Sequence, residues 1–341
     1  MVSSSTINDW HNRTCDLLHP LYNALRRHLM KSPYIHCDEN AFSFYNQEQH
    51  KIKMQNVSIW ALSDALGPDV LFQYELGKKN NEIAMSLLKS YNGTVQTDAS
   101  ALYEQFEKDP TKVMLGCWIH CRRYFIDGLT EDEASAGTAI AAINRLYKIE
   151  YDADIAGLSI EERKEKRQKE AYLVIKDLET WLYTKVGINP EKSPMAKAAN
   201  YALTHMPKLA RYVNDGRFRP GNNDIEEVIR PLKVGLNSYG YCHNHDAAYR
   251  DAMIYSIIAT CNKADVNPRE WMVDIMSQIK GIAPDDFASM EMLIPSEWKK
   301  PHPESHSMAH HTTEAEHVAA ILKSRAKRRE AEEEASKEKS K

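Results

Sequence analysis

Residues 34–44, with the sequence YIHCDENAFSF, open the stretch that decides the fold. They form the first of three strand-like runs, and the other two are IKMQNVSIWAL at 52–62 and DVLFQYEL at 69–76. Turn signals such as Gly67-Pro68 separate the second run from the third. The sequence therefore predicts a meander of three strands.

The chain after this meander alternates between helical and strand-like segments. A helix is predicted near 80–90 and another near 100–108, with the short strand GTVQTD (93–98) between them. The apolar run VMLGCWI at 113–119 follows. Three meandering strands followed by strand, helix and strand predict an α/β fold, in which helices pack on a mixed sheet.

Helical patterns flank this region on both sides. Residues 6–30 read as an amphipathic helix, residues 121–214 as helical throughout, and residues 223–280 as helical again. Beyond residue 298 the sequence is polar and His-rich, then highly charged, which predicts a flexible tail. The predicted division is a lead-in helix (1–33), the first part of a core (34–120), a helical insertion (121–214), the completion of the core (215–298) and the tail (299–341).

Composition limits what the protein can be. With 341 residues, 43% of them hydrophobic, the chain can form one large domain with an insertion, or two domains. It has no run of about 18 apolar residues and no basic-then-apolar start, so we expect a cytoplasmic protein without a membrane span or secretory signal. The six cysteines show no paired CxxC modules and read as reduced packing residues. Because the net charge is −4, any DNA-binding surface must be a local patch of Lys and Arg.

Three acidic residues stand out by their positions. Asp38 lies within the first strand-like run, Asp98 ends the short strand, and Glu226 follows Asn222-Asn223, which can cap the helix that begins there. Carboxylates on two neighbouring strands and on a flanking helix can converge at the edge of a sheet. Mg²⁺ prefers oxygen ligands and is commonly held by one or two carboxylates together with substrate phosphates. The alternative for each residue is a surface or turn role, which is common for carboxylates.

The sequence around these positions carries a family resemblance from about residue 5 to residue 298. The blocks that carry it are, in order, PLYNALRRHL (20–29), YIHCDEN (34–40), VQTDASALY (95–103), CWIHCRRYF (117–125), SPMAKAANYAL (193–203), NDGRFRPGNNDIEEVIRP (214–231), VNPREWMVDIM (266–276) and LIPSEW (293–298). Together they resemble the catalytic region of the insertion-sequence 66 family of DDE transposases.

The resemblance implies a ribonuclease-H-like core with an all-helical insertion before the third carboxylate. It implies that Asp38, Asp98 and Glu226 are the catalytic and metal-binding residues, which hold two Mg²⁺ or Mn²⁺ ions. The implied activity is metal-dependent phosphodiester hydrolysis and strand transfer during DNA transposition, close to the bacterial nucleoid. The implied partners are transposon-end and target DNA, further copies of the chain, and accessory proteins of the same element.

Basic residues near the three carboxylates are expected to support this chemistry or to contact DNA. Arg122 and Arg123 are candidate phosphate contacts, although they could also pair with surface carboxylates. Arg230 lies four residues after Glu226, so it could form an intrahelical ion pair with Glu226 or clamp a phosphate.

The block CWIHCRRYF leaves three interpretations of its histidine open. His120 could orient a carboxylate or touch a DNA phosphate, or it could pack in the core. Together with Cys117 and Cys121 it could also begin a zinc site, but zinc sites usually need four ligands and the sequence offers no obvious fourth.

Departures from the family pattern leave a second function open. Gly221 replaces an Asp that usually precedes the Asn pair, and Leu236 and Asn237 replace an Arg and a Lys within VGLNSYGYCHN (234–244). The loss of two positive charges would weaken DNA binding and flatten its salt dependence. Family members also usually carry a DNA-binding helical module and a Cys-rich zinc module before the lead-in helix. The alternative is a catalytically impaired or truncated relative that acts as a DNA-binding or accessory protein.

Overall fold

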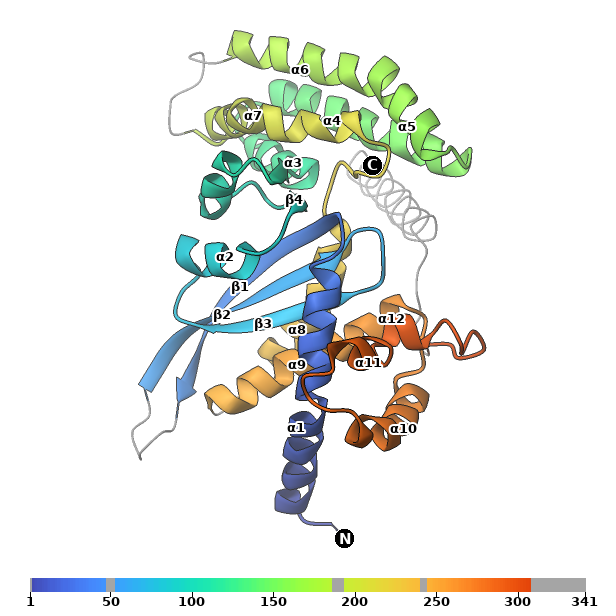
Figure 1. Ribbon diagram of the computed structural model, residues 1–341. Helices are drawn as coiled ribbons and strands as arrows, with labels where there is room; N and C mark the ends of the chain where they lie inside the picture. The colour runs from blue at the N-terminus through green and yellow to red at the C-terminus, as the bar shows by residue number, and fades with distance from the viewer. Residues whose placement is uncertain (1, 47–52, 186–192, 240–243, 308–341) are drawn as a thin grey trace, which may run out of the picture.

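A computed structural model describes residues 2–46, 53–185, 193–239 and 244–307 of the chain, and its centre is a five-stranded mixed sheet (Figure 1). The strands lie in the order β3-β2-β1-β4-β5. Antiparallel pairing joins β1 to β2 and β2 to β3, whereas β1, β4 and β5 run parallel to one another. This confirms the predicted meander followed by crossover strands. The strands are β1 (Tyr34–Asn46), β2 (Lys53–Asp64), β3 (Val70–Leu76), β4 (Gly93–Gln96) and β5 (Lys112–Leu115).

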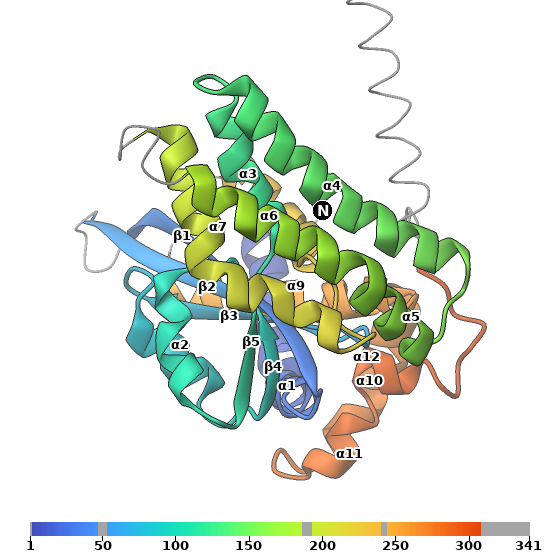
Figure 2. The same cartoon turned by 90° about the horizontal axis from the view of Figure 1, so that it is seen from above.

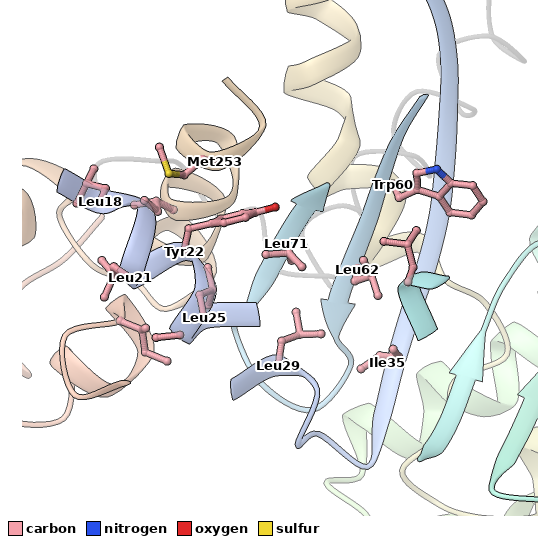
Figure 3. Packing of buried hydrophobic residues seen from close by; sticks show 14 of the residues in the cluster. Leu18, Leu21, Tyr22, Leu25, Leu29, Ile35, Trp60, Leu62, Leu71 and Met253 are labelled. Carbon is pink, nitrogen blue, oxygen red and sulfur yellow. The ribbon is translucent and has the colours of Figure 1, made fainter. Parts of the chain in front are cut away.

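One face of the sheet packs against helix α1 (Ser4–Leu29), the predicted lead-in helix. The Ser3 hydroxyl caps this helix by accepting from the Thr6 N–H at 3.2 Å. Its buried side chains recur at helical spacing. In Figure 3, Tyr22 and Leu29 lie toward Leu71 and Ile35 of the strands, whereas Leu18 lies beside Met253 of α9. Burial of this stripe removes large aliphatic side chains from water and fixes α1 on the sheet.

The opposite face is covered by helix α8 (Asn223–Tyr239), whose Ile225 and Ile229 pack in one cluster with Ala61 of β2. Helix α9 (His245–Lys263) lies along β3, at the edge of the sheet. Its Ser256 hydroxyl accepts from the Phe72 N–H at 2.8 Å, and its Thr260 hydroxyl accepts from the Val70 N–H at 3.0 Å. These side chains supply hydrogen-bond partners that an edge strand otherwise lacks.

The helices that lie between β5 and α8 in the sequence form a separate layer (Figure 2). This layer has a hydrophobic core of its own. It was predicted to start at residue 121, and its first helix starts at Trp118. Within it, the fully buried Arg167 donates to both oxygens of Glu150, and also to the backbone oxygens of Tyr212, Asp215 and Phe218. This buried ion pair therefore ties the layer to the segment that leads into α8. The helices are α3 (Trp118–Gly128), α4 (Glu133–Ile155), α5 (Ile160–Lys166), α6 (Tyr172–Lys185) and α7 (Pro194–Ala210), and a π-helical turn (Arg167–Ala171) joins α5 to α6.

Short helical elements complete the described structure. Helix α2 (Asn81–Leu88) and a 3-10 helix (Ala101–Lys108) connect the strands, and a second 3-10 helix (Arg211–Asn214) follows α7. Helices α10 (Pro268–Gln278), α11 (Phe287–Glu291) and α12 (Pro295–Trp298), with a 3-10 turn (Ile279–Gly281), pack beside α1 and α9. None of the helices within the described ranges is both long and apolar enough to span a membrane.

The packed region extends beyond the predicted start of the tail at residue 299. The Lys299 ammonium donates to the Asp265 carbonyl at 2.8 Å, and the buried Ser305 hydroxyl donates to Glu270 at 2.8 Å. Polar composition concealed these contacts, because they depend on hydrogen bonds to distant segments and not on apolar burial. The remainder of the predicted tail, 308–341, lies outside the described residues.

Candidate active site

Asp38 lies on β1, and Asp98 follows the parallel neighbouring strand β4. β1 pairs with β4 so that Ile35 is opposite Val95 and His36 is opposite Gln96. Asp38 lies two residues beyond this pairing and Asp98 two residues past the end of β4, and the charge of Asp98 acts on Asp38. Asp38 is also the antiparallel partner of Ala61, which packs against α8. The two predicted carboxylates therefore lie near each other where β4 ends beside β1, close to the sheet face that α8 covers.

The surroundings of Asp38 oppose its negative charge. Burial, followed by the nearby carboxylates of Glu39 and Asp98, raises the pKa of Asp38 to about 7. The Glu39 N–H donates to Asp38 Oδ1 at 2.8 Å, and Lys233 on α8 adds positive potential, but together they offset only part of this rise. Asp98 has a similar local bond, because the Ser100 N–H donates to its Oδ1 at 2.9 Å. Crowded carboxylates of this kind are a site where a bound cation would relieve repulsion.

Glu39, the next residue of the DEN motif, lies on the other face of the sheet and has a structural environment. Its side chain is buried, accepts from the Tyr103 hydroxyl at 2.6 Å and pairs with Lys79 at 3.0 Å. Strand alternation separates it from Asp38, even though the two residues are adjacent in sequence.

A buried polar network, which sequence reasoning missed, joins the segments that carry the site. The Tyr34 hydroxyl donates to Gln96 Oε1 and lies 3.1 Å from His36 Nε2. The Gln96 amide nitrogen donates to the carbonyls of Gly116 and Arg219, each at 2.9 Å. Gln96 thereby connects the strands of Asp38 and Asp98 to the starts of α3 and α8. The signal was the spacing, because Gln96 and His36 each lie two residues before a predicted carboxylate.

Glu226 lies in the first turn of α8 and is bound by two residues of α3. The Arg123 guanidinium donates from Nη2 to Glu226 Oε2 at 2.5 Å, and His120 Nε2 lies 3.6 Å from Glu226 Oε1. Burial and then the charge of Arg123 lower the pKa of His120, although Asp98 and Glu226 act in the opposite direction. His120 is therefore within electrostatic range of the second and third carboxylates.

The three carboxylates are the right type of ligand for a hard divalent cation, but Glu226 is not placed to share a cation with the other two. Carboxylate oxygens are the ligands that Mg²⁺ and Mn²⁺ prefer. Glu226 Oε1 is buried and has no hydrogen-bond partner within the part of the chain that the structure describes. Over the same residues, no three His, Cys, Asp or Glu side chains lie close enough together to hold a metal ion. A shared site for all three carboxylates therefore requires these side chains to move closer together.

Of the other predicted supporting residues, Arg122 contacts the helical insertion and Arg230 is exposed to solvent. Arg122 donates from Nε to Asn144 of α4 at 3.0 Å, so it contacts the helical layer. Arg230 is exposed on α8, and within the described ranges no ion pair joins it to Glu226. The predicted intrahelical pair is therefore wrong, because Arg123 of α3 binds Glu226 instead. Lys233, which sequence reasoning did not select, is the α8 cation whose charge acts on Asp38.

The Asn pair at the start of α8 differs from the expectation. Asn222 is fully buried, and neither polar atom of its side chain has a hydrogen-bond partner among the described residues, so its amide does not cap α8. Asn223 is exposed and lines a cavity of about 320 Å³ beside α4. A Cβ at Gly221 would lie 2.7 Å from the Tyr147 hydroxyl, so Tyr147 fills the space that an Asp at this position would need. Within the altered segment 234–244, residues 240–243 and the side chains of 236–239 lie outside the described structure.

The cysteines of the CWIHC block do not gather with other possible ligands into a zinc site within the described residues. Cys117 and Cys121 are both fully buried, and they belong to no group of possible metal ligands in the part of the chain described. Burial raises the pKa of Cys117 to about 11 and also raises that of Cys121. Cys121 packs in the core of the helical layer.

The sequence of the chain matches the model of a known protein family. The sequence model described as "Transposase IS66 family" matches residues 1–250. The chain belongs to the IS66 family of transposases. Membership confirms the resemblance inferred from the ordered sequence blocks.

Relatives of this IS66 family chain occur in Sinorhizobium fredii strain NBRC 101917 / NGR234. Uncharacterized protein y4hP is 24% identical over 318 residues, which cover 88% of this chain and 57% of y4hP. Uncharacterized protein y4qI is 26% identical over 240 residues, which cover 68% of this chain and 44% of y4qI. Uncharacterized protein y4jD is 24% identical over 310 residues, 87% of this chain and 60% of y4jD. The chain thus spans about half the length of these relatives.

Proposed function

We propose that the chain is the catalytic region of a DNA transposase with a ribonuclease-H-like core, in which Asp38, Asp98 and Glu226 hold two Mg²⁺ or Mn²⁺ ions. The observation that carries this proposal is the parallel pairing of β1, which holds Asp38, with β4, which leads to Asp98, on the sheet beneath α8, the helix of Glu226. The sheet order, three antiparallel strands followed by two parallel ones, supports the core assignment. Membership of the transposase family supports the reaction class.

In the proposed reaction, a water oxygen attacks the scissile phosphorus, and the P–O3′ bond breaks to free a 3′-hydroxyl. That hydroxyl then attacks a phosphorus of the target DNA. A new P–O3′ bond forms while the target's own P–O3′ bond breaks and frees a target 3′-hydroxyl, so the strands are joined without a covalent protein intermediate. When bound, the ions supply charge neutralisation for the attacking and leaving oxygens. Asp38 and Asp98 provide the paired oxygen ligands, and His120 positions Glu226. Arg123 and Lys233 provide positive charge for the DNA phosphates.

The proposal is tested by nicking of supercoiled plasmid by the purified chain in the presence of Mn²⁺. We expect nicking by the wild type and its loss in Asp38→Asn and Asp98→Asn, because each change removes a ligand oxygen charge. Asp127→Asn, at an exposed position on α3, is the matched control and should retain nicking. Equal nicking by Asp38→Asn and the wild type would refute the assignment of the site.

A second candidate function is a DNA-binding accessory protein without cleavage activity, assembled with an intact transposase. The engagement of Glu226 by Arg123 and the loss of two basic residues at Leu236 and Asn237 favour it. Salt-dependent plasmid binding by the wild type, without nicking in Mn²⁺ or Mg²⁺, would support this function over the first.

A further inference from the structure

We propose that Arg123 is an exchangeable counter-cation of the third carboxylate: it neutralises Glu226 in the free protein and moves to a DNA phosphate when substrate binds. The inference rests on the proposed function and concerns the regulation of the same site. It makes Arg123 the residue that couples DNA binding to cation binding.

In the ion pair between Arg123 and Glu226, the glutamate is mostly buried, whereas the arginine is half-exposed and can change its conformation. Glu226 is the less exposed partner, with its side chain 24% exposed, and α8 fixes it over the sheet. Arg123 is 52% exposed, at the end of a long side chain, and its Nη1 also lies 3.2 Å from His120 Nε2. A half-exposed arginine can turn toward solvent, where a phosphate of bound DNA would offer two oxygens to its guanidinium.

The carboxylates near the ion pair between Arg123 and Glu226 favour a bound cation. Asp38 and Asp98 repel each other at the sheet edge, and Glu226 Oε1 has no hydrogen-bond partner within the described residues. A cation shared by these carboxylates would compete with the guanidinium for the negative charge of Glu226, because one oxygen of Glu226 is bonded to Arg123. DNA that takes Arg123 away therefore favours cation binding, and by linkage a bound cation favours DNA binding by the same factor.

The test is a Mn²⁺ titration of the full chain followed by electron paramagnetic resonance, without DNA and with a short DNA duplex. Without DNA, we expect Arg123→Ala to bind Mn²⁺ about 1.4- to 5-fold more tightly than the wild type, the range that corresponds to loss of a solvent-exposed ion pair. With DNA, the wild type should gain Mn²⁺ affinity and Arg123→Ala should gain less. Arg123→Lys, which keeps the charge, should restore the wild-type affinity without DNA.

Arg217→Ala is the matched control, because Arg217 forms an ion pair with Asp215 at 2.6 Å and has similar exposure, at 42%. It removes the same charge away from the carboxylates and should leave Mn²⁺ affinity unchanged. Equal or weaker Mn²⁺ binding by Arg123→Ala, or equal tightening by Arg217→Ala, would overturn the exchange. Thermal melting of each variant verifies that it is folded.

Asp38→Asn separates failure of this inference from failure of the proposed function. If the wild type binds Mn²⁺ and Asp38→Asn does not, the metal site stands, and an unchanged affinity in Arg123→Ala overturns the exchange alone. If Asp38→Asn binds Mn²⁺ as the wild type does, the metal site and the exchange both fail.

Discussion

Replacement of Asp38 by Asn should stabilise the metal-free protein, and the gain should grow with pH. Burial and two neighbouring carboxylates raise the pKa of Asp38 from 3.8 to about 7. Between these two values, the unfolded chain loses this proton while the folded chain keeps it, so the wild type loses stability as pH rises and then levels off above about 7. The difference corresponds to at most about 4 kcal/mol in the free energy of unfolding.

The measurement is urea unfolding of the wild type and Asp38→Asn in EDTA, at pH 4.5 and at pH 8. Asparagine cannot ionise, so the variant should gain little at the lower pH and about 2–4 kcal/mol at the higher one. The exposed replacement Asp127→Asn controls for removal of a carboxylate and should show no such growth. A variant that is no more stable than the wild type at pH 8, or a gain independent of pH, would refute the account of a charge-crowded site.

Two further predictions concern buried polar residues that join the parts of the molecule. Gln96→Leu should lower the free energy of unfolding by about 2–4 kcal/mol, because it leaves the carbonyls of Gly116 and Arg219 without their donor, and urea unfolding tests this against the surface change Gln278→Leu. Arg167→Met should lower the free energy of unfolding by about 3–5 kcal/mol, because Glu150 stays buried with one arginine partner fewer. In thermal melts, the double variant Arg167→Met/Glu150→Leu should recover part of this loss. If it recovers none, an unpaired buried charge is not the cause.

Periodic features of the sequence predicted most of the fold. The apolar spacing of α1 and the turn signals around Gly67-Pro68 are local, and each identified an element that the structure contains. The run VMLGCWI was less informative, because its apolar residues end a strand at Leu115 and begin a helix at Trp118. A buried strand and a buried helix start have the same composition, so only tertiary packing separates them.

The candidate site was predictable in its residues and not in its contacts. Sequence context and family resemblance selected Asp38, Asp98 and Glu226, and the parallel pairing of β1 with β4 brings the segments of the first two together. The partner of Glu226 could not be inferred, because Arg123 and Glu226 are more than a hundred residues apart and meet only when α3 packs beside α8. The helical rule that paired Glu226 with Arg230 considered one helix alone.

The most direct test of the central claim is anomalous scattering from crystals of the chain soaked in Mn²⁺. We predict a peak between the carboxylates of Asp38 and Asp98, with Glu226 turned toward it and away from Arg123, and no peak in Asp38→Asn crystals. A peak bound elsewhere, or an empty space between these two carboxylates at saturating Mn²⁺, would contradict the claim that this sheet edge is a metal-dependent active site.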